Sequence, residues 1–308
     1  MAETIHPDTR VGPVHLTVRD LERSVAFYRD RLGFQVRRRT DEVAKDAAKD
    51  AAKDVANGVA YLGAGGPDLL VLTENPSAVQ ARGTTGLYHF AILVPSRHEL
   101  ARSLERLVAT RTRLTGASDH LVSEALYLND PDGNGIEIYR DRPRGEWGFE
   151  RGEVRMATEA LDLGDVLDEL DADAVREVEG AGWRGLSPQT VIGHIHLHVA
   201  DLAAAEEFYV GRLGFERMAR YGPSAVFVAA GGYHHHIGLN TWQGVGAPPP
   251  PPGAVGLRHF VIQLPDADEV ARMAERLVAA GVAVEEVEGG VIVRDPSGNR
   301  ILLVIDPA

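Results

Sequence analysis

Histidine is the residue whose spacing in this chain first points to chemistry. The segment GHIHLHV places His194, His196 and His198 at every second position. A strand in this segment would direct all three imidazoles to one face of a sheet. Imidazole is the commonest metal ligand in proteins, and a core rarely holds a polar ring without a partner. A single histidine on a strand is usually structural, but three on one face favour a metal site.

A carboxylate completes a ligand set of the same kind. Glu137 lies in the segment GIEIY, which reads as a strand, so Ile136 and Ile138 would point to the opposite face. Two histidines and one carboxylate, with coordination positions left open, suit a non-haem Fe(II) oxygenase. The other histidines of interest are His89, His120, His259 and the run at 234–236.

An internal repeat shows which elements must position these residues. VRDLERSVAFYRDRLGF at 18–34 and VADLAAAEEFYVGRLGF at 199–215 match at a constant offset. YHFAILVP at 88–95 matches RHFVIQLP at 258–265 less closely. The same is true of NDPDGNGIEIY and RDPSGNRILLV, at 129–139 and 294–304. The chain is therefore two halves of two units each, four units in all.

Each unit repeats one predicted order of elements. The opening apolar strands are expected at 11–18, 87–94, 192–199 and 257–264. A helix follows, for which Asp20 and Asp201 are placed as N-caps and Gly33 and Gly214 as C-terminal stops. Two or three β-rich runs close each unit, the last at 69–72, 136–139, 236–239 and 301–305. The pattern predicts an α+β fold of four βαβββ modules whose mixed sheets curl around a cleft.

We divide the chain at the long connection between its halves. The first domain is expected at 1–145, with modules one and two, and the second at 191–308, with modules three and four. The connection at 146–190 contains one acidic helical stretch, near 158–179. An Ala/Lys/Asp tract at 42–56 interrupts module one, and its composition favours a solvated surface helix without chemistry.

Composition narrows the classes of function. The 308 residues include 45 Asp and Glu against 32 Lys and Arg, a formal net charge of −13. Because phosphate binding needs a clustered positive surface, we expect no nucleic acid or membrane partner. The chain has no cysteine, which excludes disulfides, thiolate metal sites and a thiol nucleophile. It shows neither an apolar run of about 18 residues nor a secretory signal, so we expect a soluble cytoplasmic enzyme.

Several of these motifs together resemble a known superfamily. The LGF-ending helices and the DPDGN turn before GIEIY are similar to those of the vicinal oxygen chelate superfamily. This superfamily includes glyoxalase I, bleomycin-resistance proteins and type I extradiol dioxygenases. HIHLHVADL, GGYHHHIGLN and the two-half layout most resemble catechol 2,3-dioxygenases. The resemblance covers nearly the whole chain and implies two barrels of the vicinal oxygen chelate fold.

The resemblance also implies which residues bind the metal. In this superfamily a metal-binding histidine stands on the first strand, seven residues before the residue that opens the helix. A metal-binding glutamate stands on the last strand. His194 holds the histidine position in module three and His89 holds it in module two, where Glu137 supplies the carboxylate. The implied ligands are therefore His89, Glu137 and His194.

Each sequential pair of modules lacks a ligand, and this decides how we expect the modules to pair. Module one has Pro13 at the histidine position, and module four has Leu302 in place of the glutamate. The sequential pair of modules one and two therefore lacks a first-strand histidine, and the pair of modules three and four lacks a carboxylate. We expect the complete set from module two with module three, which leaves one and four as a supporting barrel. The alternative is sequential pairing, in which His15 would join His89 and Glu137.

The same resemblance implies catalytic residues around the metal. Tyr127 stands ten residues before Glu137, at a spacing similar to that of the family, and His120 lies close upstream. A further catalytic histidine must come from the HHH run of module three. His235 is the aligned choice and His236 the near alternative, because a slip of one residue would exchange their faces.

The implied activity is Fe(II)-dependent extradiol cleavage of catechol or a substituted catechol. A small aromatic diol and dioxygen would react to give a ring-opened product, 2-hydroxymuconic semialdehyde in the case of catechol, as part of aromatic catabolism. The same ligands also bind Mn(II). Two alternatives stay open: a glyoxalase-like metal-dependent isomerase, and a metal-free protein that binds a small molecule. Assembly into homo-oligomers also stays open.

Overall fold

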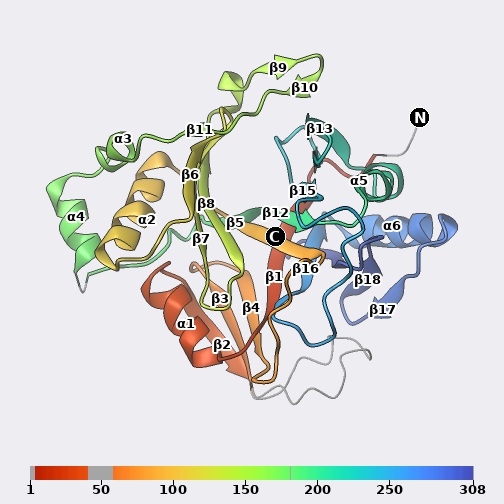
Figure 1. Ribbon diagram of the computed structural model, residues 1–308, viewed down its shortest axis with the longest axis horizontal. Coiled ribbons are helices and arrows are strands. Elements are labelled where there is room, and N and C mark those ends of the chain that lie inside the picture. The colour runs from red at the N-terminus through yellow and green to blue at the C-terminus, as the bar shows by residue number, and fades with distance from the viewer. Residues whose placement is uncertain (1–3, 41–57, 181, 308) are drawn as a thin grey trace.

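The computed structural model describes residues 4–40, 58–180 and 182–307 (Figure 1). The helix expected at 42–56 lies outside the described residues. In the described part of the chain, no helix combines the length and apolar character that a membrane span requires.

The first two modules have the predicted order of strand, helix and three strands. Module one consists of β1 (Arg10–Val18), α1 (Leu21–Asp30), β2 (Gln35–Thr40), β3 (Val59–Gly63) and β4 (Asp68–Glu74). Module two consists of β5 (Gly86–Leu93), α2 (Arg97–Ala109), β6 (Gly116–Asp119), β7 (Ser123–Asn129) and β8 (Gly135–Asp141).

The last two modules repeat this order. Module three consists of β12 (Val191–His198), α5 (Leu202–Glu206) with a π-helical continuation (Glu207–Arg212), β13 (Glu216–Tyr221), β14 (Ala225–Ala229) and β15 (Ile237–Asn240). Module four consists of β16 (Gly256–Leu264), α6 (Ala267–Ala279), β17 (Glu285–Val287), β18 (Gly290–Arg294) and β19 (Arg300–Ile305). The four-module prediction is confirmed.

The helices of modules one and three begin and end at the predicted signals. The side chain of Asp20 accepts a hydrogen bond from the Arg23 backbone N–H, and Asp201 accepts one from Ala204. Each bond satisfies a backbone donor that the first helical turn leaves free. Gly33 follows α1 with a φ of +84°, a left-handed conformation that favours glycine.

The two sheets pair the modules across the sequence halves. Modules one and four form an eight-stranded sheet in the order β17-β18-β19-β16-β1-β4-β3-β2. Modules two and three, with the short strand β11 (Glu159–Ala160), form a nine-stranded sheet in the order β11-β6-β7-β8-β5-β12-β15-β14-β13. The expected pairing of module two with module three is confirmed, and the sequential alternative is wrong. The halves 1–145 and 191–308 therefore do not form separate sheets, because each sheet takes strands from both.

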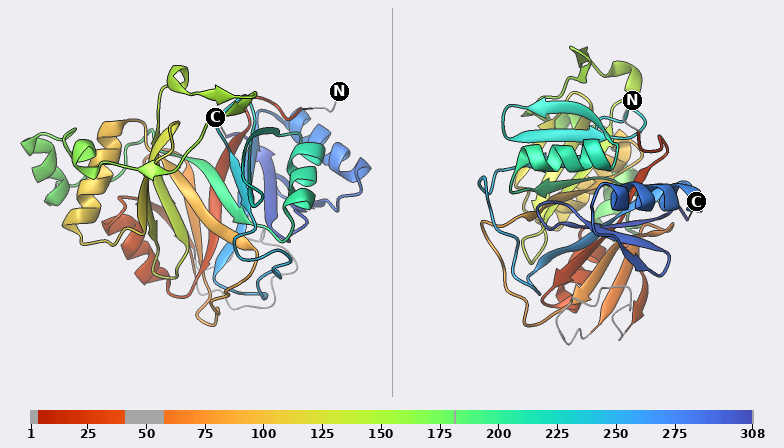
Figure 2. Two further views of the ribbon diagram at one scale, coloured as in Figure 1. Left: turned by 45° about the horizontal axis from the view of Figure 1, so that its top comes forward. Right: turned by 90° about the vertical axis from the view of Figure 1, so that its right-hand side faces the viewer.

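The first strands of the modules make the junction within each sheet. β1 runs antiparallel to β16, and β5 runs antiparallel to β12. The helices of modules one and two lie to one side of the molecule, and those of modules three and four lie to the other side (Figures 1 and 2). The junction between β5 and β12 is where residues from the two halves of the sequence meet.

The connection between the halves differs from the prediction of one helix near 158–179. It forms β9 (Phe149–Glu150), β10 (Glu153–Val154), β11, α3 (Leu163–Leu167) and α4 (Ala172–Glu179). The helical run is divided because Asp171 accepts hydrogen bonds from the Asp173 and Ala174 backbone N–H groups and so caps a second helix. Both short helices pack against α2.

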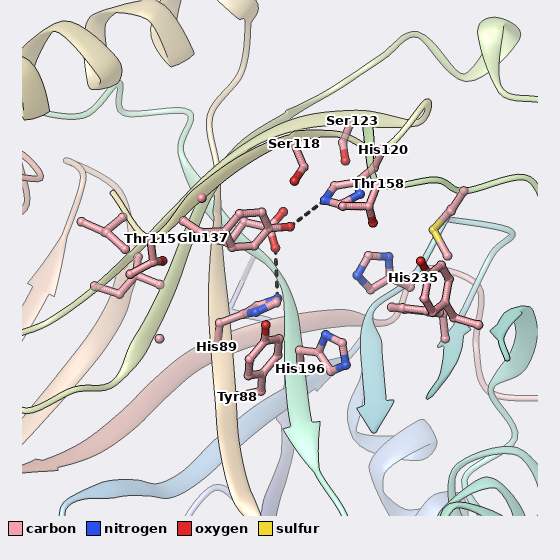
Figure 3. Close-up of a pocket in the computed structure, with 18 of the residues that line it drawn as sticks. Tyr88, His89, Thr115, Ser118, His120, Ser123, Glu137, Thr158, His196 and His235 are labelled. Atoms are coloured by element: carbon pink, nitrogen blue, oxygen red, sulfur yellow. Dashed lines mark hydrogen bonds and ion pairs between the residues drawn. The ribbon is translucent and has the colours of Figure 1, made fainter. Parts of the chain in front are cut away.

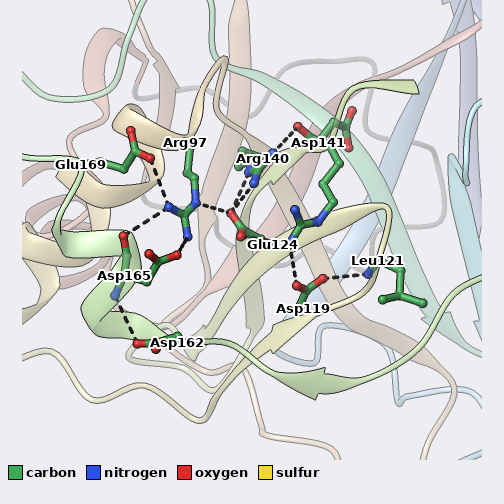
Figure 4. A network of polar contacts seen from close by, with 10 residues as sticks. Arg97, Asp119, Leu121, Glu124, Arg140, Asp141, Asp162, Asp165 and Glu169 are labelled. Atoms are coloured by element: carbon green, nitrogen blue, oxygen red, sulfur yellow. Dashed lines mark hydrogen bonds and ion pairs between the residues drawn. The ribbon is translucent and has the colours of Figure 1, made fainter. Parts of the chain in front are cut away.

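A network of ion pairs around one buried carboxylate joins the connection to module two (Figure 4). Glu124 on β7 is 3% exposed and accepts hydrogen bonds from Arg97 and Arg140. The same Arg97 guanidinium reaches Asp165 on α3 and Glu169 just beyond it. Several guanidinium partners supply the opposite charge and the hydrogen bonds that a buried carboxylate needs. The connection is therefore fixed to the sheet that carries the site.

Two equivalent tyrosines join the sheets to each other. The Tyr28 hydroxyl of module one donates to Asp130 Oδ2 at 2.9 Å, in the turn before β8 of module two. Tyr209, at the matching place in module three, donates to Asp295 in the turn before β19. Burial raises the pKa of both aspartates, and each also accepts backbone N–H groups of its own turn. The duplicated turns thus depend on a hydroxyl from a neighbouring module.

We expect Tyr28→Phe to lower the free energy of unfolding by about 1–3 kcal/mol, because the buried Asp130 Oδ2 loses one of its two donors and keeps only the Asn134 amide. Urea unfolding followed by circular dichroism measures this change. Tyr221→Phe is the control, since its side chain is 53% exposed. Equal stability of the two variants would contradict the inference that the Tyr28 hydroxyl supports the turn.

Candidate metal centre and active site

The nine-stranded sheet brings the three expected ligands together. Ala91 on β5 lies opposite Glu137 on β8 and opposite His194 on β12, and His89 lies two residues along β5 on the same face. One ligand atom of each side chain lies within 4.8 Å of the others. Glu137 Oε2 is 3.0 Å from Nε2 of both histidines. All three side chains are buried.

The donor atoms fit a metal ion. Within the described part of the chain, His89 Nε2 is buried without a hydrogen-bond partner of acceptable geometry, although Glu137 Oε2 is close. Such an orphaned nitrogen is costly unless another group takes its lone pair. Metal–ligand distances of about 2.0–2.1 Å place two neighbouring ligands roughly 3 Å apart, as found here. The set has no thiolate, and imidazole with carboxylate suits divalent iron or manganese.

The charge states of the ligands also suit a metal. Burial alone would raise the pKa of Glu137, but the imidazoles of His194 and His89 hold that pKa well below its usual range. Burial lowers the pKa of His194, although Glu137 opposes this shift. An ionised carboxylate and neutral imidazoles are the forms that bind metal ions.

Tyr127 and His120 lie together beside this cluster. Tyr127 on β7 is the register partner of Glu137, and its hydroxyl is 2.7 Å from His120 Nε2. His120 Nδ1 is 2.6 Å from the Ala157 carbonyl oxygen, which only accepts hydrogen bonds. Nδ1 must therefore carry the proton, and Nε2 accepts from the Tyr127 hydroxyl. Burial, with the nearby charge of Glu137, raises the pKa of Tyr127 well above its usual range, so the phenol keeps its proton.

A strained turn holds His120 in place (Figure 4). Leu121 has a φ of +67°, which is unfavourable for a residue with a side chain. Its backbone N–H donates to Asp119, and Asp119 also accepts from Arg142. These bonds offset the strain and fix the residue between them, His120. The sequence showed no signal of this turn.

The structure also places the two histidine candidates of module three. His235 lines the cavity, and its ring centroid is 4.1 Å from that of His194. His236 Nδ1 instead accepts the Ala230 backbone N–H. Burial lowers the pKa of His235 well below its usual range, with further lowering by His194 and the buried His234. His235, the aligned choice, is therefore the one beside the ligand cluster.

The remaining histidines of the strand pattern differ in their surroundings. His196 lines the cavity, with its ring centroid 5.0 Å from that of His89. His198 Nδ1 is 2.8 Å from Asn240 Oδ1, which is a structural contact. In the other sheet, His15 and His259 stack on each other with centroids 3.9 Å apart. His15 therefore does not join the ligand cluster, as the sequential alternative required.

A cavity of about 430 Å³ adjoins the cluster (Figure 3). The labelled side chains of His89, Glu137, His120 and His235 surround it in the close-up. Its other walls are largely apolar or aromatic and include Tyr88, Met156, Tyr221, Phe227 and Trp242. Such a lining, with few polar groups at one end, suits a small aromatic ligand.

Sequence reasoning missed part of this wall. Met156, Ala157 and Thr158 belong to the connection between the halves, which the sequence marked only as a linker. They reach the cavity because β11 adds to the edge of the sheet beside β6. The buried residue His234 was seen only as part of a run, and its partner Asp141 carried no signal.

Comparison with known proteins shows the family of this chain. The sequence profile described as the Glyoxalase/Bleomycin resistance protein/Dioxygenase superfamily matches residues 10–138 and 191–303. A catechol-2,3-dioxygenase of Bacillus subtilis (strain 168) is 47% identical over 307 residues, covering 98% of this chain and 99% of that protein. A biphenyl-2,3-diol 1,2-dioxygenase of Rhodococcus globerulus is 28% identical over 120 residues, covering 37% of this chain and 63% of that protein.

Solved structures show the same fold at low sequence identity. One from Bacillus subtilis has a TM-score of 0.66 and 15% identity, covering 99% of this chain and 87% of that chain. Glyoxalase I from Zea mays has a TM-score of 0.57 and 16% identity, covering 97% of this chain and 92% of that chain. At these identities the likeness concerns the fold alone.

Proposed function

This chain belongs to the Glyoxalase/Bleomycin resistance protein/Dioxygenase superfamily, as its motifs indicated, and from this we propose that it is an Fe(II)-dependent extradiol dioxygenase. Its substrates would be catechol or a substituted catechol and dioxygen. The observation that carries the proposal is the convergence of His89, Glu137 and His194 at one end of an aromatic-lined cavity. The likeness to a catechol-2,3-dioxygenase over nearly the whole chain supports it.

His89, Glu137 and His194 would hold the iron. When bound, Fe(II) would hold the diol and dioxygen together and lower the pKa of a diol hydroxyl. Both oxygen atoms of dioxygen enter the product, so the reaction needs no external reductant. Mn(II) suits the same ligands, and metal analysis of the active protein decides between the two.

Tyr127 and His120 would bind one oxygen of the diol. The Tyr127 phenol keeps its proton and can donate a hydrogen bond to a substrate oxygen. In the free site this proton is donated to His120 Nε2, and when it turns to a substrate oxygen, His120 Nε2 becomes an acceptor for a proton that the diol releases. The contact of His120 with the Ala157 carbonyl keeps the ring in the tautomer that this role requires.

His235 would act beside the ligand cluster as an acid–base group. Its ring lies against His194 but is not among the three residues that converge as ligands. A neutral imidazole there can take up a proton and return it to a product oxygen. The apolar wall formed by Phe227 and other residues would keep water from the same oxygen atoms.

The ligand set favours a dioxygenase over an isomerase. Glyoxalase-like sites commonly take a carboxylate from each of two modules. β15, the last strand of module three, has the sequence IGLN and contributes no carboxylate. The presence of all three ligands likewise argues against a metal-free binding protein.

Oxygen uptake tests the proposal. We expect protein loaded anaerobically with Fe(II) to consume dioxygen when catechol or a substituted catechol is added, with a ring-opened product formed in equal amount. Metal-free protein is the control. An iron-loaded protein that consumes no dioxygen with any catechol of a panel would overturn the proposal.

We expect Tyr127→Phe to lower kcat by about 10-fold, the value of roughly one hydrogen bond of 1–1.5 kcal/mol. Iron content should not change, since the Tyr127 hydroxyl is not one of the ligand atoms. Steady-state oxygen uptake and metal analysis measure both. Wild-type turnover in this variant would show that the hydroxyl does not act on the substrate.

A further inference from the structure

A chain of hydrogen bonds runs from His235 away from the cavity. His235 Nδ1 is 2.8 Å from His234 Nδ1, and His234 Nε2 is 2.8 Å from Asp141 Oδ1. His234 is fully buried and packs against Tyr233 and Trp147. Neither His234 nor Asp141 belongs to the ligand cluster or lines the cavity. Their position behind His235 is therefore not explained by metal binding or by substrate contact.

The carboxylate sets the direction of the bonds around it. An ionised Asp141 only accepts hydrogen bonds. The Tyr233 hydroxyl donates to its Oδ2 at 2.9 Å, and the Tyr139 hydroxyl in turn lies 2.8 Å from that of Tyr233. A phenol ordinarily keeps its proton at neutral pH, so each hydroxyl can donate. The remaining oxygen, Oδ1, requires a proton on His234 Nε2.

This direction passes on to His235. A neutral imidazole carries one proton, so a His234 ring that donates from Nε2 has a lone pair on Nδ1. The close contact between the two Nδ1 atoms then requires the proton of His235 to lie on Nδ1. His235 Nε2 takes no part in this series of hydrogen bonds, so it is left as an acceptor.

We propose that Asp141 and His234 are positioning residues that fix His235 in its Nδ1–H tautomer and hold Nε2 ready to accept a proton. The catalytic meaning of this arrangement rests on the function proposed above. The arrangement has the logic of a carboxylate that orients a catalytic imidazole, with one additional imidazole between them. The Asp141 side chain is 25% exposed, so the chain begins at the surface and ends at the buried His235.

The tautomer can be measured without turnover. We expect nitrogen NMR of protein labelled with ¹⁵N-histidine and loaded with diamagnetic Zn(II) to show His235 protonated at Nδ1. The His235 signals are assigned by their loss in His235→Phe. In Asp141→Ala the His234 tautomer is no longer set, so both tautomers of His235 should appear. Protonation of His235 at Nε2 in the wild-type protein would overturn the proposal.

Kinetics of iron-loaded variants separate positioning from folding. His234→Phe removes the acceptor for the His235 Nδ1–H. We expect kcat to fall about 10- to 100-fold, which is less than the loss of the acid–base group itself because His235 remains in place. KM and iron content should stay within about twofold. His234→Asn places an amide oxygen near the position of Nδ1, and we expect it to restore most of the lost turnover. Wild-type kcat in His234→Phe would overturn the proposal, as would an equal loss in both variants.

Tyr233→Phe is the matched control. It removes the hydrogen bond to Asp141 Oδ2 and leaves the bond between Asp141 and His234. We expect its kcat to stay within about threefold of the wild type, and a loss as large as that of His234→Phe would count against the proposal. If the iron-loaded wild type consumes no dioxygen, the proposed function fails. The NMR measurement of the His235 tautomer then still tests whether Asp141 and His234 position this ring.

Discussion

Glu137→Gln should give a folded protein that no longer retains iron and has no measurable oxygen uptake. The variant removes the one negative charge among the three converging ligands and leaves two neutral imidazoles. Changes to outer partners of a metal site cost about 10- to 100-fold in affinity or activity. Loss of a direct anionic ligand should exceed that range. Metal analysis after gel filtration, with circular dichroism to confirm folding, measures the result.

The other sheet supplies a matched control for this variant. Leu302 on β19 lies opposite Val261 of β16, as Glu137 on β8 lies opposite Ala91 of β5. Leu302→Met is a volume-conserving change at the equivalent position, so we expect full iron content and turnover. Iron retention in Glu137→Gln, or its loss in Leu302→Met, would show that the ion is bound elsewhere.

The pairing of the modules was predictable because it depended on residue types alone. Pro13 and Leu302 occupy ligand positions with side chains that cannot bind a metal, so neither sequential pair of modules offered a full set, whereas modules two and three together did. The strands, the helix caps and the repeat follow local signals of periodicity and turn chemistry. These signals are confirmed, at residues such as Asp20 and Gly33, because each depends on the backbone of its own helix end and not on distant contacts.

Features that depend on distant contacts were not predictable in this way. His234 meets Asp141, 93 residues earlier, only because β15 and β8 belong to one sheet. Ala157 reaches His120 because the connection adds a short strand to the sheet edge. The division of the connection into two helices depends on the cap at Asp171, a residue inside the acidic stretch that reads as continuous.

The two sheets also show what the duplication has kept and lost. The eight-stranded sheet retains His15 and His259 but has Leu302 at the position equivalent to Glu137, and the two rings stack on each other. Burial lowers the pKa of His15 to about 3, and Arg258 adds to the shift, so this ring is neutral. Without an anion beside them, the two imidazoles form a packing contact. The carboxylate is therefore what separates the candidate site from its structural counterpart.

His235→Phe should lower kcat by about 10²- to 10⁴-fold, the range that a positioned acid–base group contributes. Phenylalanine keeps a planar ring of similar size beside His194 and Phe227, so packing should change little. Iron content should match the wild type, because His235 is not one of the converging ligands. The amount of ring-opened product per dioxygen consumed should also fall, since no side chain at this position could then return a proton to a product oxygen.

The neighbouring histidine provides the control for this last variant. His236→Asn keeps an acceptor near the Ala230 backbone N–H, which His236 Nδ1 now accepts. Since His236 lies outside the cavity lining, we expect its kcat to stay within about twofold of the wild type. A large loss in His236→Asn with normal turnover in His235→Phe would assign the catalytic role to the other ring. His235 faces the cavity, whereas His236 bonds a backbone N–H outside it. The two variants therefore distinguish an acid–base role of His235 from a requirement for any imidazole near the iron.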